Sequence, residues 1–170
     1  MKIFLSFFTL LICLAAIAQP GKKKLSNDDL RKSAGSWTGN YNEYQDGKVL
    51  RSAEASLEMK WVGDSLQLSL HVKWTDSESA EETGLHLSAD GSKLFFEGKE
   101  YDVLKVLRNS GQLVITVQDA AENSNINGVE ADVRKTFNIA PDNFIISTDV
   151  QFSGNDKFVK RNQYWFSRKK

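Results

Sequence analysis

Cysteine is almost absent from this sequence: the 170 residues contain one, Cys13. If the export signal described below is removed after Ala18, the remaining chain has none. We therefore expect neither a disulfide framework nor a thiol nucleophile in the mature protein. Lipidation of Cys13 is not expected, because Ile12 stands where lipoprotein processing requires a small residue. A cysteine-free exported domain fits a bacterial periplasm or exterior better than a disulfide-rich animal secretion.

Net charge is also lacking, since 22 lysines and arginines balance 22 aspartates and glutamates. A neutral domain has no long-range attraction to nucleic acid or to an anionic membrane surface. The basic run at 22–24 lies just after the expected cleavage site, where a solvated tail is its expected role. We therefore expect no nucleic-acid partner.

Long apolar runs are confined to the N-terminus. A short basic start is followed by an almost wholly apolar stretch at 3–17, and Ala16 and Ala18 occupy the small-residue positions that precede a signal-peptidase site. This pattern predicts a signal peptide at 1–18 and a mature chain that begins at Gln19. The expected location is secreted or periplasmic, with no transmembrane segment after signal removal.

Common catalytic motifs are missing as well. The sequence has no Gly-x-Ser-x-Gly elbow, phosphate loop or dinucleotide-binding fingerprint. Its two histidines, His71 and His86, are not at a metal-ligand spacing and have no accompanying carboxylate cluster. We therefore expect neither a metal site nor a cofactor.

One short helix is predicted, and strands follow it to the end of the chain. Ser26 is a suitable N-cap, Asp28 and Asp29 favour the positive end of a helix dipole, and Gly35 ends the helix. The expected organisation is a flexible N-terminal arm at 19–25 and a single domain at 26–170.

Alternation of apolar and polar residues predicts strands with one buried face. The clearest apolar stripes are Ala53, Ala55, Leu57, Met59 and Trp61; Leu66, Leu68, Leu70, Val72 and Trp74; Leu113, Ile115 and Val117; and Phe144, Ile146, Thr148, Val150 and Phe152. Turn pairs such as Asp46-Gly47 separate them. We expect eight to ten antiparallel strands in an all-β, up-and-down barrel, which leaves no free sheet edge. A two-sheet sandwich is the alternative.

The segment Gly35-Ser36-Trp37-Thr38-Gly39, placed after a short helix and before the first strand, resembles the Gly-x-Trp start of lipocalins and the wider calycin superfamily. The resemblance makes Gly35, Trp37 and Gly39 structural residues and places Trp37 at the closed end of a barrel. Thr148-Asp149-Val150 is similar to a second lipocalin motif but lacks its aromatic residue. In lipocalins a late arginine crosses the tryptophan, and both Arg161 and Arg168 are candidates here.

Further implications of the resemblance concern ligands. Haem-binding barrels related to calycins use a late histidine ligand, and no histidine follows His86. Fatty-acid-binding proteins hold a carboxylate with an Arg-x-Tyr pair near the C-terminus. Here Arg161 and Tyr164 are three residues apart, on opposite faces of a strand, so that pair is not reproduced.

Six residues are candidates for lining a ligand pocket: Tyr41, Glu43, Trp61, Trp74, Lys160 and Tyr164. Tyr41 and Glu43 share the strand face of Trp37. Trp61 and Trp74 each end an apolar stripe. Strict alternation places Lys160 and Tyr164 on one face, where the lysine could meet an anionic head group.

The expected function is an exported, lipocalin-like binding module for a small apolar or amphipathic ligand. One alternative is a barrel enzyme, in which an inward Glu43 with a raised pKa transfers protons. Another is a structural or interaction protein with a filled core. The residues do not identify the ligand, protein partners or the oligomeric state.

Overall fold

The computed structural model describes residues 24–120, 125–126 and 128–170, so the expected signal peptide lies outside the described residues. The elements are α2 (Asn27–Arg31), β1 (Gly35–Gln45), β2 (Lys48–Val62), β3 (Ser65–Lys73), β4 (Glu78–Leu87), β5 (Lys93–Phe96), β6 (Lys99–Asn109), β7 (Gln112–Asp119), β8 (Asn125–Ile126), β9 (Val129–Ile139), β10 (Asn143–Phe152) and β11 (Val159–Arg168).

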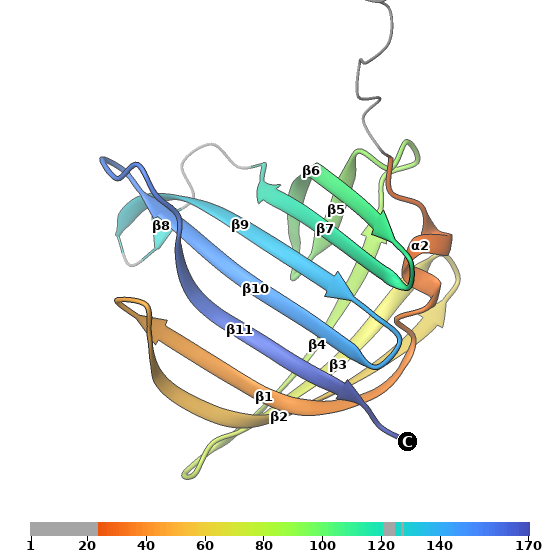
Figure 1. Cartoon of the computed structure of the whole chain (residues 1–170), viewed down its shortest axis with the longest axis horizontal. Coiled ribbons are helices and arrows are strands. Elements are labelled where there is room, and N and C mark those ends of the chain that lie inside the picture. The colour runs from red at the N-terminus through yellow and green to blue at the C-terminus, as the bar shows by residue number, and fades with distance from the viewer. Residues whose placement is uncertain (1–23, 121–124, 127) are drawn as a thin grey trace, which may run out of the picture.

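Ten of these strands form a closed antiparallel barrel (Figure 1). Consecutive strands pair from β1 to β7 and from β9 to β11, β7 pairs with β9, and β11 returns to pair with β1. Among the described strands, the two-residue β8 pairs with β9 alone. The predicted all-β, up-and-down barrel with one short N-terminal helix is therefore confirmed, and the sandwich alternative is wrong. No helix in the described part of the chain is long and apolar enough to cross a membrane.

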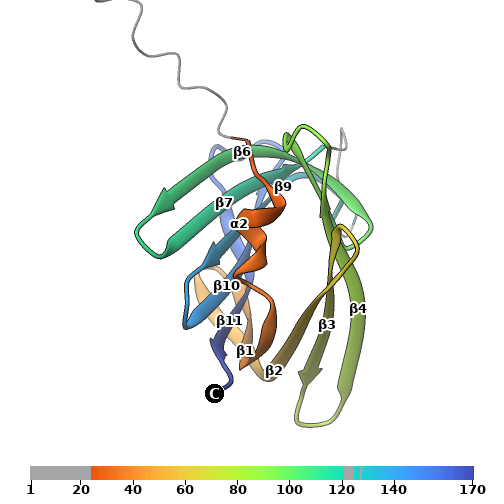
Figure 2. The same cartoon turned by 90° about the vertical axis from the view of Figure 1, so that its right-hand side faces the viewer.

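The two ends of the barrel differ. Helix α2 leads directly into β1 and lies across one end, as the view in Figure 2 shows. Because successive strands are antiparallel, the β1–β2, β3–β4, β5–β6 and β10–β11 connections all lie at the other end, which we call the mouth.

Helix α2 is fastened at its N-terminus by one carboxylate. Asp29 accepts hydrogen bonds from the backbone N–H and hydroxyl of Ser26, both at 2.8 Å. It also accepts from Nε and a terminal nitrogen of Arg108 on β6, at 2.7 and 2.6 Å. The guanidinium hydrogen bond is the main reason that the pKa of Asp29 falls from 3.8 to about 2. A helix of five residues is thereby tied to the barrel wall.

Replacing Asp29 by asparagine is expected to lower the free energy of unfolding near neutral pH by about 1 kcal/mol, since solvent screens the pair partly. A carboxyl group with a depressed folded-state pKa stabilises the fold above its unfolded pKa, and that contribution is lost as the pH falls towards about 2. Urea melts across this range should show the two proteins converging in acid. Asp28→Asn is the control, because Asp28 is exposed and forms an exposed ion pair with Arg31 on the same helix. A pH-independent difference would contradict the prediction.

Leu25, which the sequence-based division placed in the flexible arm, belongs to the barrel domain. It is 3% exposed and packs into the core. Its backbone N–H donates to the carbonyl of Gly91 at 3.2 Å. Gly91 has a φ of +67°, and a Cβ there would lie 2.0 Å from the carbonyl oxygen of Leu25, so only glycine fits.

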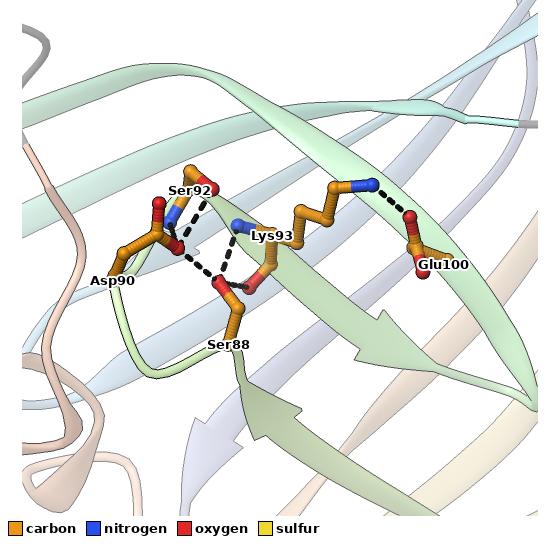
Figure 3. Close-up of polar contacts among 5 residues, drawn as sticks. All are labelled: Ser88, Asp90, Ser92, Lys93 and Glu100. Atoms are coloured by element: carbon orange, nitrogen blue, oxygen red, sulfur yellow. Dashed lines mark hydrogen bonds and ion pairs between the residues drawn. The ribbon is translucent and has the colours of Figure 1, made fainter.

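Side-chain hydrogen bonds hold the β4–β5 turn that carries Gly91 (Figure 3). Asp90 Oδ1 accepts from Ser88 Oγ at 2.7 Å, from Ser92 Oγ at 2.8 Å and from the Ser92 backbone N–H at 3.1 Å. These donors lower the pKa of Asp90. Beside the turn, Lys93 forms an ion pair with Glu100. The cluster lies at the α2 end and is a structural feature of the turn.

The closed end is built around Trp37, which is 1% exposed. Its indole N–H donates to the Ser33 carbonyl at 2.9 Å. The Arg168 guanidinium carbon lies 4.2 Å from the centroid of the Trp37 ring. Arg168 also donates to the carbonyls of Lys32, Ala34 and Pro141 at 2.7, 3.0 and 2.8 Å. Of the two candidate arginines, Arg168 is therefore the one that crosses the tryptophan.

Candidate functional site

Inward side chains are more enclosed near α2 than towards the mouth. Beside α2 there is also a hollow of about 700 Å³, between the helix and the β6–β7 and β9–β10 turns, lined by Asp28, Asp29, Lys32, Arg108, Asn109, Gly111, Gln112, Leu113, Ile139, Ala140, Pro141 and Arg168. The following inward side chains are almost completely buried: Trp37, Met59, Leu66, Ile115, Phe137, Phe144 and Phe166. Further along the same strand faces, side chains become partly exposed, including those of Tyr41 on β1, Thr83 on β4 and Tyr164 on β11. The mouth half is therefore the part of the barrel where a small molecule can reach inward side chains.

Three predicted pocket residues form one aromatic cluster in this half. The rings of Tyr41 and Tyr164 have centroids 4.6 Å apart, and the ring of Trp74 meets that of Tyr41 edge-on at 5.7 Å. The register explains the meeting, because Tyr41 is paired with Tyr164 on one side and with Ala53 on the other. Small Ala53 leaves room for the ring of Trp74, which directly follows β3.

Glu43 lies beside this cluster in an ion pair. Arg51 donates to its carboxylate at 2.5 and 2.8 Å, and the Tyr41 hydroxyl donates to it at 3.2 Å. The Arg51 hydrogen bonds are the main reason that the pKa of Glu43 is lowered. Burial and the adjacent carboxylate raise the pKa of Tyr41 to about 12. Near neutral pH the pair is ionised and the phenol is neutral, which suits binding better than proton transfer.

Hollows of moderate size adjoin the cluster. One of about 220 Å³ is lined by Tyr41, Glu43, Tyr44, Gln45, Leu50, Arg161 and Asn162. Another of about 410 Å³ lies at the rim and opens on the outer side of the barrel, because most of its lining residues are exposed: Asn40, Ser52, Ala53, Glu54, Lys73, Trp74 and Thr75. The first is smaller than a typical drug-sized pocket, so it fits a small group or part of a larger ligand.

Two predicted pocket residues lie elsewhere. A register shift between Thr148 and Asp149 pairs Lys160 with Asp149, whose side chain points to the outer face. Strict alternation therefore fails at Lys160, and its ammonium lies 5.5 Å from the ring centroid of Tyr44. Trp61 lies at the α2 end, where the guanidinium carbon of Arg31 is 5.3 Å from its ring centroid.

An interior ion pair was missed by the sequence interpretation. Lys135, on the inward face of β9, is 7% exposed, and its Nζ lies 2.7 Å from Oε2 of Glu97 in the β5–β6 turn. The detectable signal was a lysine at a core position of the alternating stripe Ala131, Val133, Lys135, Phe137 and Ile139. Glu97 had no comparable signal, because a turn glutamate is ordinarily solvated.

Neither histidine belongs to the aromatic cluster at the mouth. His71 is exposed, and the ring of His86 stacks on that of Phe95 with centroids 4.5 Å apart. Within the described residues, no three His, Cys, Asp or Glu side chains are grouped in a way that could hold a metal ion.

The barrel is similar to a solved protein of closely matching extent. The crystal structure of Rv2717c from M. tuberculosis superposes with a TM-score of 0.59, covering 87% of this chain and all of that one. The fold is calycin-like. At 11% identity the likeness shows the fold alone. A shared fold does not determine what a barrel binds.

Other comparisons add no argument about function. A protein of unknown function from the DUF3598 family of Nostoc punctiforme gives a TM-score of 0.39 at 15% identity, covering 85% of this chain and 47% of that protein. No protein-family model matches the chain, and neither does any curated protein sequence.

Proposed function

We propose that this protein is an exported binding module, whose mouth half holds a small amphipathic molecule against Tyr41, Trp74 and Tyr164. The observation that carries the proposal is the contrast within one barrel. The inward rings of Trp37, Phe137, Phe144 and Phe166 are buried, whereas those of Tyr41, Trp74 and Tyr164 remain partly exposed together at the mouth. At the α2 rim, the inward ring of Trp61 is also partly exposed. Aromatic faces left accessible in a concave site are typical of ligand pockets.

The alternative of a barrel enzyme receives less support from the site. Its proposed acid or base was Glu43, and Arg51 lowers the pKa of that carboxyl group rather than raising it. The alternative of a filled core fits the α2 end well. It does not account for the partial exposure of Tyr41, Trp74 and Tyr164 on inward faces.

Ligand binding is expected to quench tryptophan emission and to raise the melting temperature with ligand concentration, because only the folded state has the site. A panel of fatty acids, retinoids and sterols provides the probes. Trp74→Phe should remove most of the quenching, whereas Trp165→Phe should leave it, because Trp165 is on the outer face. No thermal shift with any probe at high concentration would reject the proposal and favour the filled core.

Blocking the site provides a matched test. Ala53 lies beside Tyr41 on the inward face of β2, so Ala53→Trp should fill the space next to the aromatic cluster and abolish the thermal shift. Ser56→Trp places the same side chain on the outer face of β2, away from both hollows, and should preserve binding. Equal binding by both variants would show that ligands bind somewhere else.

Export is the part of the proposal that depends on residues outside the described range. Protein recovered from the periplasm or culture medium of its host should begin at Gln19 and carry no lipid. N-terminal sequencing with intact-mass measurement tests this directly. A lipid-modified Cys13 as the first residue would contradict it.

A further inference from the structure

The interior ion pair between Lys135 and Glu97 lies on the inward wall near Tyr164 of the aromatic cluster. Ile146 of β10 is paired with Tyr164 on one side and with Phe137, two residues from Lys135, on the other. Lys135 is paired with Val117 and Thr148 across its two neighbouring strands, all on the inward face. Its Nζ is 5.3 Å from the ring centroid of Phe96. Thr148 is also nearly buried, so this part of the wall combines an ammonium and a hydroxyl among apolar side chains.

The two partners of the pair are unequally enclosed. The side chain of Lys135 is 9% exposed, whereas that of Glu97 is 28% exposed. Glu97 sits at the tip of the short β5–β6 connection, where its N–H donates to Thr83 Oγ1 at 3.0 Å. A small movement of the turn can return the glutamate carboxylate to water. The lysine ammonium, fixed in the middle of β9, has no such route.

The backbone at Glu97 gives no local reason for a glutamate. Glu97 and Gly98 have φ values of +53° and +70°, a left-handed pair that favours asparagine, aspartate or glycine at the first position. The β1–β2 turn has the same geometry at Asp46 and Gly47 and uses a residue type suited to it. Glu97 differs from Asp46 in its ion pair with Lys135, which a shorter side chain in the turn is less suited to reach.

Stability alone does not account for the pair. Removing two charges from water offsets much of their attraction, and well-packed apolar residues are often at least as stabilising. An enclosed ammonium whose counter-ion stands on a more exposed turn is suited to exchanging that counter-ion. Burial is the main reason that the pKa of Tyr164 is raised, and the nearby carboxylates of Glu97 and Glu81 add to it. An entering anion therefore meets negative charge, and that charge decreases when Glu97 leaves.

We propose that Lys135 anchors the carboxylate of an amphipathic acid, which takes the place of Glu97 as the counter-ion of the lysine. The inference rests on the proposed function and adds the chemical class of the ligand. The apolar part of the acid lies against the aromatic cluster, and its carboxylate receives hydrogen bonds from the Lys135 ammonium. Glu97 rotates into the solvent at the mouth. No covalent bond is formed or broken.

The test compares cis-parinaric acid with its methyl ester, which differ in charge and hardly in apolar surface. Lys135→Met should weaken binding of the acid about tenfold, the loss expected for a charge-assisted hydrogen bond, and leave the ester within about twofold. Glu97→Gln should strengthen binding of the acid by a similar factor, because the competing charge is removed. Asp46→Asn, at the equivalent position of the β1–β2 turn, should change neither affinity.

Different results reject the Lys135 anchor alone or reject it together with the proposed binding function. If the wild-type protein binds both probes and the acid-to-ester ratio is the same in all variants, the Lys135 anchor is rejected and the binding module stands. If the wild-type protein binds neither probe, both are rejected. Should Lys135→Met fail to fold cooperatively, Glu97→Gln decides: an unchanged affinity for the acid overturns the exchange, and an increase supports it.

Discussion

Replacing Trp37 by alanine is expected to lower the free energy of unfolding by about 3–5 kcal/mol, the usual range for deleting a buried aromatic side chain. The ring is 1% exposed and lies between the ring of Phe144, at a centroid distance of 5.9 Å, and the guanidinium of Arg168. The substitution also leaves the Ser33 carbonyl without the indole donor. Chemical denaturation monitored by circular dichroism measures the loss.

Trp165 provides the matched control for this substitution. It is on β11, two residues before Ser167, and its side chain is 57% exposed. Trp165→Ala should change the stability by no more than about 0.5 kcal/mol, as is usual for exposed positions. An Arg168→Ala variant and the double variant with Trp37→Ala would complete a cycle that isolates the cation–ring contact. Equal losses at Trp37 and Trp165 would mean that Trp37 is not enclosed.

Much of the fold could be predicted because its signals are local. A period of two identifies a strand and its buried face, and Asp-Gly pairs identify tight hairpins. Closure of the barrel depends on pairing between β1 and β11, which are separated by more than a hundred residues. No local pattern encodes that pairing, so the sandwich remained an alternative until the structure excluded it. The choice of Arg168 over Arg161 likewise depends on which residue of β11 lies opposite Trp37.

In the candidate site, too, local patterns predicted single residues but not the contacts between strands. Tyr41, Trp74 and Tyr164 were each identifiable as inward aromatic residues, but their contact depends on the register of three different strands. Lys160 was misplaced because a bulge interrupts the alternation of β11, and a single extra residue reverses the face of everything beyond it. The partner of Lys135 could not be predicted, because Glu97 reaches it from a turn across the interior.

Replacing Gly39 by alanine is expected to destabilise the barrel by about 3 kcal/mol or more, at the upper end of the range for overpacking. Gly39 lies in β1 opposite Phe166 of β11, at the pairing that closes the barrel. A Cβ at this position would lie 1.8 Å from the carbonyl oxygen of Trp165. That oxygen belongs to the backbone, so it cannot turn aside as the end of a side chain would. The two strands must separate, and hydrogen bonds between them are lost.

Gly84 is the control that distinguishes this clash from a general intolerance of alanine in strands. It lies within β4, has no positive φ, and a Cβ there would meet no atom within 4 Å. Gly84→Ala should therefore be neutral or stabilise the protein by about 0.4–1 kcal/mol, because alanine restricts the unfolded chain. Urea melts of the two variants, with the slope compared against wild type, provide the measurement. Similar stabilities for Gly39→Ala and Gly84→Ala would show that β1 and β11 do not approach as closely as the barrel requires.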